Sequence, residues 1–357
     1  MPDNLLSHTN ELRPEAAAAA GGVPHPPRAS QPLARRLARA GLAAADAICA
    51  ALTPGWVRDT PGLVVLALHS LCRSRAELHD PALAPNQNVC VEDFRALVEA
   101  MLECGYVAVT PEQVAAGLAP GGKYVLFTFD DGYFNNTLAL DVLESCRVPA
   151  AFFISSNHVL EGRGFWWDVV HRELAAAGLS TSARNAQVRR FKALLPGQIE
   201  RVLRARHGPA ALRPRGDGDR PFAPAELADF ARNRWVHLGN HTADHGILTR
   251  CTPDEARRQI EQCQAALRSI TGTAPVAIAY PNGNHSPAVA AAARAAGLRI
   301  GLTVQPARNP LAAADDQRLM RLGRFYFHGR PDVDLEFRGY RGGFVPSRLV
   351  HRMLQAA

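Results

Sequence analysis

The chain lacks the features that mark secreted and membrane-spanning proteins. Its 357 residues include only seven cysteines, an odd number, and no two of them stand at Cys-x-x-Cys spacing. Neither a disulfide framework nor a cysteine zinc site is therefore indicated, and a reducing compartment fits this composition. No signal peptide is visible over residues 1–31, and no apolar run reaches the roughly 18 residues that a membrane span needs. We expect a protein that is cytoplasmic or peripheral to the inner membrane.

A strong excess of one charge is also missing. The chain has 40 Lys and Arg against 33 Asp and Glu, a formal net charge of +7. The basic residues are mostly arginine and are scattered, without a nucleic-acid-reading motif or a basic stripe interleaved with aromatic residues. We therefore expect no nucleic-acid partner. Hydrophobic residues make up 47% of the chain, which is ample material for a globular core.

The two ends of the chain differ in composition from the rest. Residues 1–31 are rich in Ala, Pro and Gly, and we expect a disordered tail there. In residues 32–60 a group of arginines precedes a mildly apolar stretch, which predicts an amphipathic helix and a linker. Packing of this helix on the domain is expected, and a peripheral membrane contact through residues 32–52 is the alternative. We assign residues 61–330 to the main domain and 331–357 to a C-terminal extension.

Short apolar runs alternate with helical patterns through the main domain. This βαβα repetition predicts a parallel sheet or barrel with helices outside, in the α/β class. Strands are expected over residues 63–68, 106–109, 124–129, 150–154, 235–238, 276–279, 300–304 and 324–327. Helices are expected over 91–104, 138–146, 253–270 and 287–296, and Thr252 followed by Glu255 marks the start of the third. About seven strands suit one barrel-sized domain.

The alternation breaks over residues 161–233, which we interpret as an insertion. This stretch is polar, rich in arginine and punctuated by Gly and Pro. Helices are expected over 167–177 and 224–233, with a loop over 214–221. The pair Trp166 and Trp167 could line a sugar-binding face, and the alternative is that these rings form a small core of the insertion.

Two adjacent carboxylates stand at the end of a buried strand. The apolar run 124–129 leads directly into Asp130, Asp131 and Gly132. Where a strand ends and the backbone turns, neighbouring side chains can both reach one pocket. A polar turn that merely closes the strand is the alternative. His69 ends another predicted strand and is a second pocket candidate, with the same alternative.

His241 and His245 stand four residues apart just after a predicted strand. This spacing would place both imidazoles on one face of a helical turn, which suits a single metal ion. With Asp131 as the third ligand, open positions would remain for water and a substrate carbonyl, as in hydrolytic metal sites, and Asp130 could act as general base. A turn at another strand end could supply backbone N–H groups to an oxyanion. It consists of Tyr280, Pro281, Asn282 and Gly283.

Three motifs together resemble those of the polysaccharide deacetylases of carbohydrate esterase family four, also called the nodulation-deacetylase homology domain. They are Thr128-Phe129-Asp130-Asp131-Gly132, His241-Thr242-Ala243-Asp244-His245 and Tyr280-Pro281-Asn282-Gly283. The resemblance covers roughly residues 64–327. It implies a distorted (β/α) barrel of about seven strands and a divalent metal, usually zinc, held by Asp131, His241 and His245. The implied reaction is hydrolysis of an N-acetyl group of an amino sugar, with Asp130 as base.

The chain departs from the family pattern at two positions. The family commonly has an arginine two residues before the proline of the third motif, where this chain has Ala279. We nominate Arg324, in the last predicted strand, as the basic partner of Asp130. The family often ends on a Leu-x-His motif whose histidine is the general acid. This chain has Phe327-His328-Gly329 instead, so His328 is the candidate acid and a solvated loop histidine is the alternative.

The sequence therefore predicts a metal-dependent hydrolase that removes N-acetyl groups from amino sugars of a polysaccharide, an oligosaccharide or a lipid-linked saccharide. Two alternatives remain open at this point. One is a hydrolase of another acyl group, such as a formyl amide or an O-acetyl ester. The other is a non-catalytic glycan-binding protein, which the two departures from the family pattern would explain.

Overall fold

The computed structural model describes residues 41, 60–79, 88–310, 316–329 and 333–340. The tail expected over residues 1–31 lies outside these ranges, and so does the helix and linker expected over 32–60, apart from residues 41 and 60. Within the described ranges, no helix has the length and apolar character to cross a membrane.

The core of the fold is one sheet of parallel strands. Seven strands lie in the order β10-β1-β5-β6-β7-β8-β9, and the short β4 also pairs with β5. Their bounds are Gly62–Leu68 (β1), Val107–Ala108 (β4), Lys123–Phe129 (β5), Ala150–Ile154 (β6), Val236–Asn240 (β7), Ala277–Ala279 (β8), Ile300–Leu302 (β9) and Phe325–Tyr326 (β10). Strands Ser70–Cys72 (β2) and Asn88–Cys90 (β3) form a separate pair. The predicted parallel sheet is confirmed.

The sheet curls until its two edges approach each other. Leu302 in the edge strand β9 forms a parallel bridge with Leu322, which precedes the opposite edge strand β10. The Thr303 N–H donates to the Leu322 carbonyl at 2.8 Å, and the Leu322 N–H donates to the Gly301 carbonyl at 2.8 Å. This closure confirms the predicted distorted (β/α) barrel.

Both faces of the sheet are buried, which explains why its strands are continuous apolar runs. Side chains alternate between the faces along β1. Leu63 and Val65 belong to a cluster inside the curl that also contains residues of β5, β6, β8 and β9. Val64, Leu66 and Leu68 belong to a larger cluster between the sheet and the surrounding helices.

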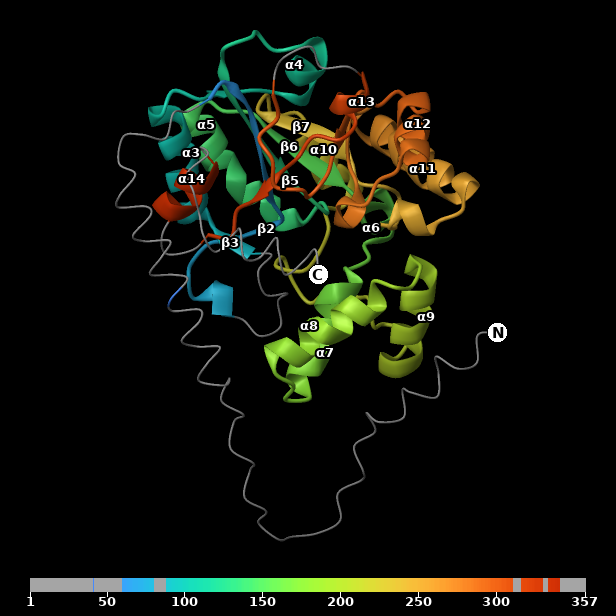
Figure 1. The fold of residues 1–357 in the computed structure, drawn as a ribbon. Coiled ribbons are helices and arrows are strands. Elements are labelled where there is room, and N and C mark those ends of the chain that lie inside the picture. The colour runs from blue at the N-terminus through green and yellow to red at the C-terminus, as the bar shows by residue number, and fades with distance from the viewer. Residues whose placement is uncertain (1–40, 42–59, 80–87, 311–315, 330–332, 341–357) are drawn as a thin grey trace, which may run out of the picture. The chain divides into compact units, whose positions relative to one another are not determined.

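Helices cover the outer face of the sheet (Figure 1). They include Val91–Glu103 (α3), Leu140–Cys146 (α5), Ser156–Glu161 (α6), Pro253–Thr271 (α11), Pro287–Ala295 (α12) and Val333–Tyr340 (α14). Helices Pro111–Ala116 (α4) and Asp316–Leu319 (α13) instead pack with the cluster inside the curl. The predicted start of α11 is confirmed, because the Thr252 side chain accepts the Glu255 N–H at 3.3 Å. Phe337 and Tyr340 of α14 are buried in the same outer cluster as β1 and α3, so this part of the C-terminal extension packs on the barrel.

The insertion contains more helix than the sequence predicts. Its helices are Trp166–Ala176 (α7), Thr181–Phe191 (α8), Pro196–His207 (α9) and Pro224–Phe230 (α10). Helices α8 and α9 were not predicted because few of their residues are apolar, and only Phe191, Ile199 and Leu203 are buried apolar side chains there. These side chains join Trp166 and Trp167 in a small separate core. Figure 1 shows α7, α8 and α9 grouped below the barrel.

Candidate active site

The predicted site residues meet at the carboxyl ends of the parallel strands. Asp130 and Asp131 follow β5, His241 follows β7, and His69 follows β1. They line one cavity of about 290 Å³, together with His245, Asn282 and His328. Because all strands run the same way, residues that follow different strands share one edge of the sheet. Tertiary structure thus brings together motifs that are far apart in the sequence.

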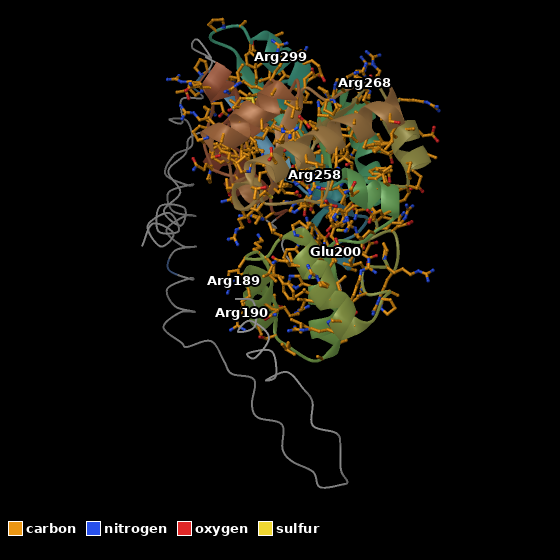
Figure 2. The ribbon with its side chains drawn as sticks, turned by 90° about the vertical axis from the view of Figure 1, so that its right-hand side faces the viewer. Arg189, Arg190, Glu200, Arg258, Arg268 and Arg299 are labelled. Carbon is orange, nitrogen blue, oxygen red and sulfur yellow. The ribbon has the colours of Figure 1, made fainter. Side chains whose placement is uncertain are left out.

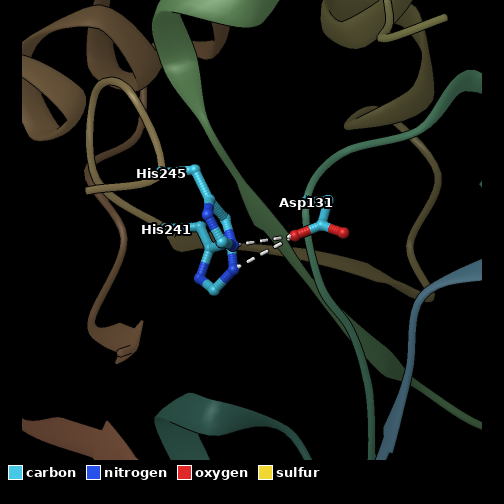
Figure 3. A group of neighbouring side chains, drawn as sticks. All are labelled: Asp131, His241 and His245. Atoms are coloured by element: carbon cyan, nitrogen blue, oxygen red, sulfur yellow. Dashed lines mark ion pairs between the residues drawn. The ribbon is translucent and has the colours of Figure 1, made fainter. Parts of the chain in front are cut away.

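Three side chains in this cavity form a group that could hold a metal ion. One ligand atom from each of Asp131, His241 and His245 lies within 4.8 Å of the others. The Nε2 atoms of both histidines lie 3.3 Å from Asp131 Oδ1 (Figure 3). Asp131 is 1% exposed, and neither of its carboxylate oxygens accepts a hydrogen bond from the described residues. Buried carboxylate oxygens without donors are costly, and a bound cation would compensate them.

The loop that carries the two histidines is not helical, so the expected helical turn is wrong. Thr242 and His245 have φ angles of 65° and 54°, in the left-handed region. The Thr242 N–H donates to the Asn240 side chain at 2.9 Å, and the Gly246 N–H donates to Thr242 Oγ1 at 3.1 Å. Such side-chain acceptors stabilise tight turns in place of a helix. Asp131 is also left-handed, with φ of 78°.

Each histidine is held by a neighbour. His241 Nδ1 donates to the Ala279 carbonyl at 2.7 Å, which leaves Nε2 directed toward Asp131. The His245 ring packs edge-on against Trp167 at 4.6 Å between ring centres. Trp167 Nε1 donates to the Tyr133 hydroxyl at 2.7 Å, and this hydroxyl donates to Asp168 at 2.6 Å. Side chains of the insertion therefore help to orient one of the candidate ligands.

Asp130 forms a buried ion pair with Arg324, the residue that the sequence nominates as its partner. The two terminal nitrogens of Arg324 each donate to one oxygen of Asp130, both at 2.7 Å. Arg324 is fully buried, and it also donates to the Thr303 carbonyl and to Thr128 Oγ1. Burial opposes ionisation of Asp130, but the charges of Arg324 and His241 outweigh it and lower the pKa of this carboxyl. Asp130 is therefore held in its ionised form.

Asp131 is held ionised in a similar way. Its burial also opposes ionisation, and the neighbouring imidazoles of His241 and His245 keep its pKa well below the usual range. Two adjacent carboxylates thus both carry charge inside one cavity, each with a different compensating group.

His69 and His328 both stack on one tyrosine. The Tyr326 ring stacks on His69 at 5.7 Å and on His328 at 5.9 Å. All three side chains line the cavity. Burial lowers the pKa of His69 although Asp130 and Asp131 favour its protonation. His328 is exposed, and its backbone N–H donates to Glu336 at 3.1 Å.

Of the third motif, Asn282 is the residue that lines the cavity. Tyr280 is fully buried, and its hydroxyl donates to the Met320 carbonyl at 3.0 Å, away from the cavity. The N–H groups of Tyr280 and Gly283 donate to the carbonyls of Leu302 and Tyr280, and Pro281 has no N–H. Asn282 is therefore the candidate backbone donor of this turn. Gly283 has φ of 73°, and a Cβ there would lie 2.7 Å from the Val304 backbone nitrogen.

The insertion also contributes to the cavity wall. Trp166 lines the cavity while it packs in the core of the insertion, so the two alternatives for this residue are compatible. The sequence analysis did not identify His171, Asn185 and Lys192, which line the same wall. No motif marks these residues, because their position depends on how α7 and α8 pack against the barrel. A polar side chain on an arginine-rich helix gives no local signal of a binding site.

A family model matches the part of the chain that contains most of this site. Residues 118–301, just over half of the 357, match the polysaccharide deacetylase family. The chain therefore belongs to the polysaccharide deacetylase family. It is accordingly a hydrolase of the kind that acts on carbon–nitrogen amide bonds of N-acetyl groups. No curated protein matches the chain in sequence.

Solved structures share the fold at low sequence identity. The deacetylase PplD of Streptococcus pyogenes, solved in complex with acetate, is 16% identical, with 77% of this chain and 96% of that chain covered and a TM-score of 0.53. IcaB from Ammonifex degensii is 18% identical, with 79% of this chain and 97% of that chain covered and a TM-score of 0.53. A polysaccharide deacetylase from Bacillus cereus is 17% identical, with 79% of this chain and 69% of that chain covered and a TM-score of 0.54. At these identities the similarity establishes the fold.

Proposed function

We propose that the chain is a metal-dependent deacetylase that hydrolyses the N-acetyl group of an amino sugar in a polysaccharide, an oligosaccharide or a lipid-linked saccharide. The observation that carries this proposal is the environment of Asp131. Its buried carboxylate has no hydrogen-bond donor, and two imidazole Nε2 atoms lie 3.3 Å from one of its oxygens. This arrangement suits a cation better than it suits three protein groups alone.

Asp131, His241 and His245 would hold the metal ion. One carboxylate oxygen and two imidazole nitrogens fit zinc, and zinc is our proposed metal. When bound, the ion would supply Lewis-acid activation of a water molecule and of the acetamide carbonyl. The contact of His241 Nδ1 with the Ala279 carbonyl is typical of metal-bound histidines, because it sets the tautomer that offers Nε2 to the ion.

The remaining groups act on protons and charge. Asp130, kept ionised by Arg324, accepts the proton of the attacking water as general base. The carbonyl carbon gains the hydroxyl group, and the Asn282 N–H donates to its oxygen as negative charge develops. As the carbon–nitrogen bond breaks, the leaving nitrogen takes a proton, for which His328 is the candidate donor. The products are acetate and a free amino sugar.

The experiment that tests this function measures bound metal and acetate release together. We expect wild-type protein to contain one equivalent of zinc and to release acetate from N-acetylglucosamine oligomers. Asp130→Asn should retain the metal but lose about 10²- to 10⁴-fold in kcat, because it removes the general base. His241→Ala should lose both metal and activity.

Two exposed residues provide matched controls. Asp254→Asn changes a carboxylate whose side chain is 93% exposed, and His207→Ala changes a partly exposed histidine of α9. Both variants should behave as wild type. Protein without metal in elemental analysis would refute the proposed site. Metal without acetate from any N-acetylated sugar would refute the proposed substrate, and formyl amide and O-acetyl ester substrates assayed in parallel would then identify another acyl group.

A further inference from the structure

The wall of the cavity opposite the sheet motifs comes from the insertion. Nine of the nineteen residues that line the cavity belong to residues 161–233. Most of the nine are apolar, and three are polar: His171 of α7, Asn185 of α8, and Lys192 directly after α8. The groups assigned to the reaction above lie on the barrel. The insertion is therefore free to determine which sugar the cavity accepts.

Lys192 brings a positive charge into this wall without a counter-ion. Its Nζ donates to Asn282 Oδ1 at 2.7 Å, and no carboxylate among the described residues forms an ion pair with it. Lys192 is partly buried, and among the residues that the structure describes it is the single Lys or Arg that lines the cavity. An ammonium group has three N–H donors, and a neutral amide balances none of its charge. Burial lowers the pKa of Lys192, against the attraction of Asp131.

His171 provides a second, independent sign of a missing ligand. This side chain is only 3% exposed, lines the cavity, and has no hydrogen-bond partner for Nδ1 among the described residues. Burial and the nearby charge of Arg184 lower its pKa to about 4, so the ring is neutral at neutral pH. A buried nitrogen without a partner is rare in folded proteins, so His171 is a polar residue of this wall that the described residues leave unsatisfied.

The negative charges of the cavity do not neutralise this wall. Asp130 is balanced by its bidentate pair with Arg324, and the charge of Asp131 is assigned above to the metal ion that it would hold with the two histidines. Arg189 of α8 stands three residues before Lys192, which caps the C-terminus of this helix with helical backbone angles, so the two lie on neighbouring faces of its last turn. Arg189 is exposed and has no ion pair within the described residues, and it lies on the insertion in Figure 2. Positive charge thus continues from Lys192 to the exposed surface of the insertion.

We propose that this wall binds an anionic group of the substrate, a phosphate or a carboxylate carried by the N-acetylated sugar or by the sugar next to it. Lys192 is the specificity-determining residue. Asn185 and His171 offer hydrogen bonds to the same ligand, and Arg189 attracts it from the exposed surface of the insertion. This proposal rests on the proposed function, because it assigns the substrate class of that site. The competing explanation is that Lys192 only holds Asn282 in place.

The test compares acetate release from sugars of different charge. The neutral substrate is N,N′-diacetylchitobiose, and the anionic substrates are N-acetylglucosamine 1-phosphate and a disaccharide of glucuronic acid and N-acetylglucosamine. We expect wild-type protein to prefer an anionic substrate in kcat/KM, and Lys192→Gln to reduce this preference by about 10- to 100-fold, mainly through KM, because it removes charged hydrogen bonds. Whether the phosphate or the carboxylate sugar is preferred identifies the group.

Two further variants separate charge recognition from positioning. Lys192→Arg keeps the charge and should restore much of the preference. Arg190→Gln is the matched control, since this exposed arginine of α8 lies on the helix face opposite Asn185, Val188 and Lys192 by its spacing. Its preference should equal that of wild type. Raising the salt concentration should raise KM for the anionic substrate alone.

A binding measurement decides the proposal even if no sugar is deacetylated. Calorimetric titration of the full chain with the same three sugars should show tighter binding of an anionic sugar, and Lys192→Gln should abolish the difference. Equal affinity and equal turnover of neutral and anionic sugars would overturn the proposal. So would a Lys192→Gln variant that weakens all three sugars alike. Absence of acetate from every sugar, with charge-selective binding intact, would refute the proposed function alone.

Discussion

At the scale of single residues, the site contains charges that the protein compensates in different ways. Asp130 receives two hydrogen bonds from Arg324, whereas the oxygens of its neighbour Asp131 receive none. The ion pair with Arg324 keeps the Asp130 carboxylate ionised and fixes its position. The absence of donors leaves the Asp131 carboxylate available to a ligand. The difference between these two adjacent aspartates is the basis for giving them different roles.

Arg324 should be required for both stability and reaction. Arg324→Met leaves Asp130 buried without its counter-ion, and we expect a loss of about 3–5 kcal/mol in the free energy of unfolding. Arg324→Lys retains the charge but cannot form two parallel hydrogen bonds, so it should fold with less loss and show a lower kcat. Urea denaturation and acetate release measure the two effects.

The control for this prediction is Arg268→Met, an exposed arginine of α11 visible in Figure 2. It should change the free energy of unfolding by less than about 0.5 kcal/mol. If Arg324→Lys deacetylated sugars as fast as wild type, the bidentate geometry would not matter and Arg324 would be only a counter-ion.

At the scale of elements, the loop that carries the two histidines connects the insertion to the barrel. Asp244 in this loop accepts hydrogen bonds from Asn157 of α6 at 2.8 Å and from Gln259 of α11 at 2.7 Å. It also accepts one at 2.8 Å from Arg163, which in addition pairs with Glu200 of α9. These bonds join the candidate metal loop to two barrel helices and to the insertion. A movement of the insertion would therefore change the position of His245.

The junction between α6 and the insertion should make stability depend on pH. Burial, aided by the charge of Arg163, lowers the pKa of His158 to about 3. Between about pH 6.5 and pH 3 the unfolded chain binds a proton at this residue and the folded chain does not, so stability falls as pH falls. His158→Gln should remove about 2 kcal/mol of the stability difference between pH 7 and pH 5. Urea denaturation at both pH values measures it.

The control for this prediction keeps the titration and changes the packing. Val159 is the buried neighbour of His158 on α6, and Val159→Ala should lower the free energy of unfolding by the same amount at both pH values. A His158→Gln variant with the same pH dependence as wild type would show that folding does not shift the pKa of His158.

At the scale of the whole molecule, the closed sheet brings the ends of its strands together around the cavity. Asp131 and His241 come from β5 and β7, which are separated in the sheet by β6. A metal ion bound between them would join distant parts of the folded chain. The unfolded chain does not offer this binding site. Such binding stabilises the fold by mass action.

Removal of metal should therefore lower the melting temperature of the chain. With zinc at about 100 times its dissociation constant, we expect about 2.7 kcal/mol of stabilisation, which corresponds to a shift of several degrees. Dialysis against a chelator should remove the shift, and thermal melts of His241→Ala should be the same with and without zinc. Equal melting temperatures of chelated and zinc-loaded wild-type protein would contradict the prediction.

The sequence alone was sufficient for the parallel barrel and for the motifs that meet at its strand ends, but not for the cavity residues that the insertion contributes. The strands can be predicted because sheets buried on both faces need continuous apolar runs. The strand ends can be predicted because local motifs follow them, which contain Asp130, Asp131, His241 and His245. The local backbone geometry around these residues was not predicted correctly from the sequence. The helical turn expected at His241 is a loop with left-handed residues, because the side chains of Asn240 and Thr242 accept backbone hydrogens there.

Only the tertiary structure decided which distant residues complete the site. The sequence nominated Arg324 as the partner of Asp130, but only the closed sheet places the two in contact, across 194 residues of sequence. Nothing in the sequence indicated that Lys192 contacts Asn282, across 90 residues. No periodicity or motif encodes such contacts, since they arise when the sheet closes and the insertion packs over its strand ends. The local sequence thus determined the strands, the motifs and the chemical groups, because these depend on near neighbours. The partners of those groups depend on packing between elements, and packing is a property of the folded chain.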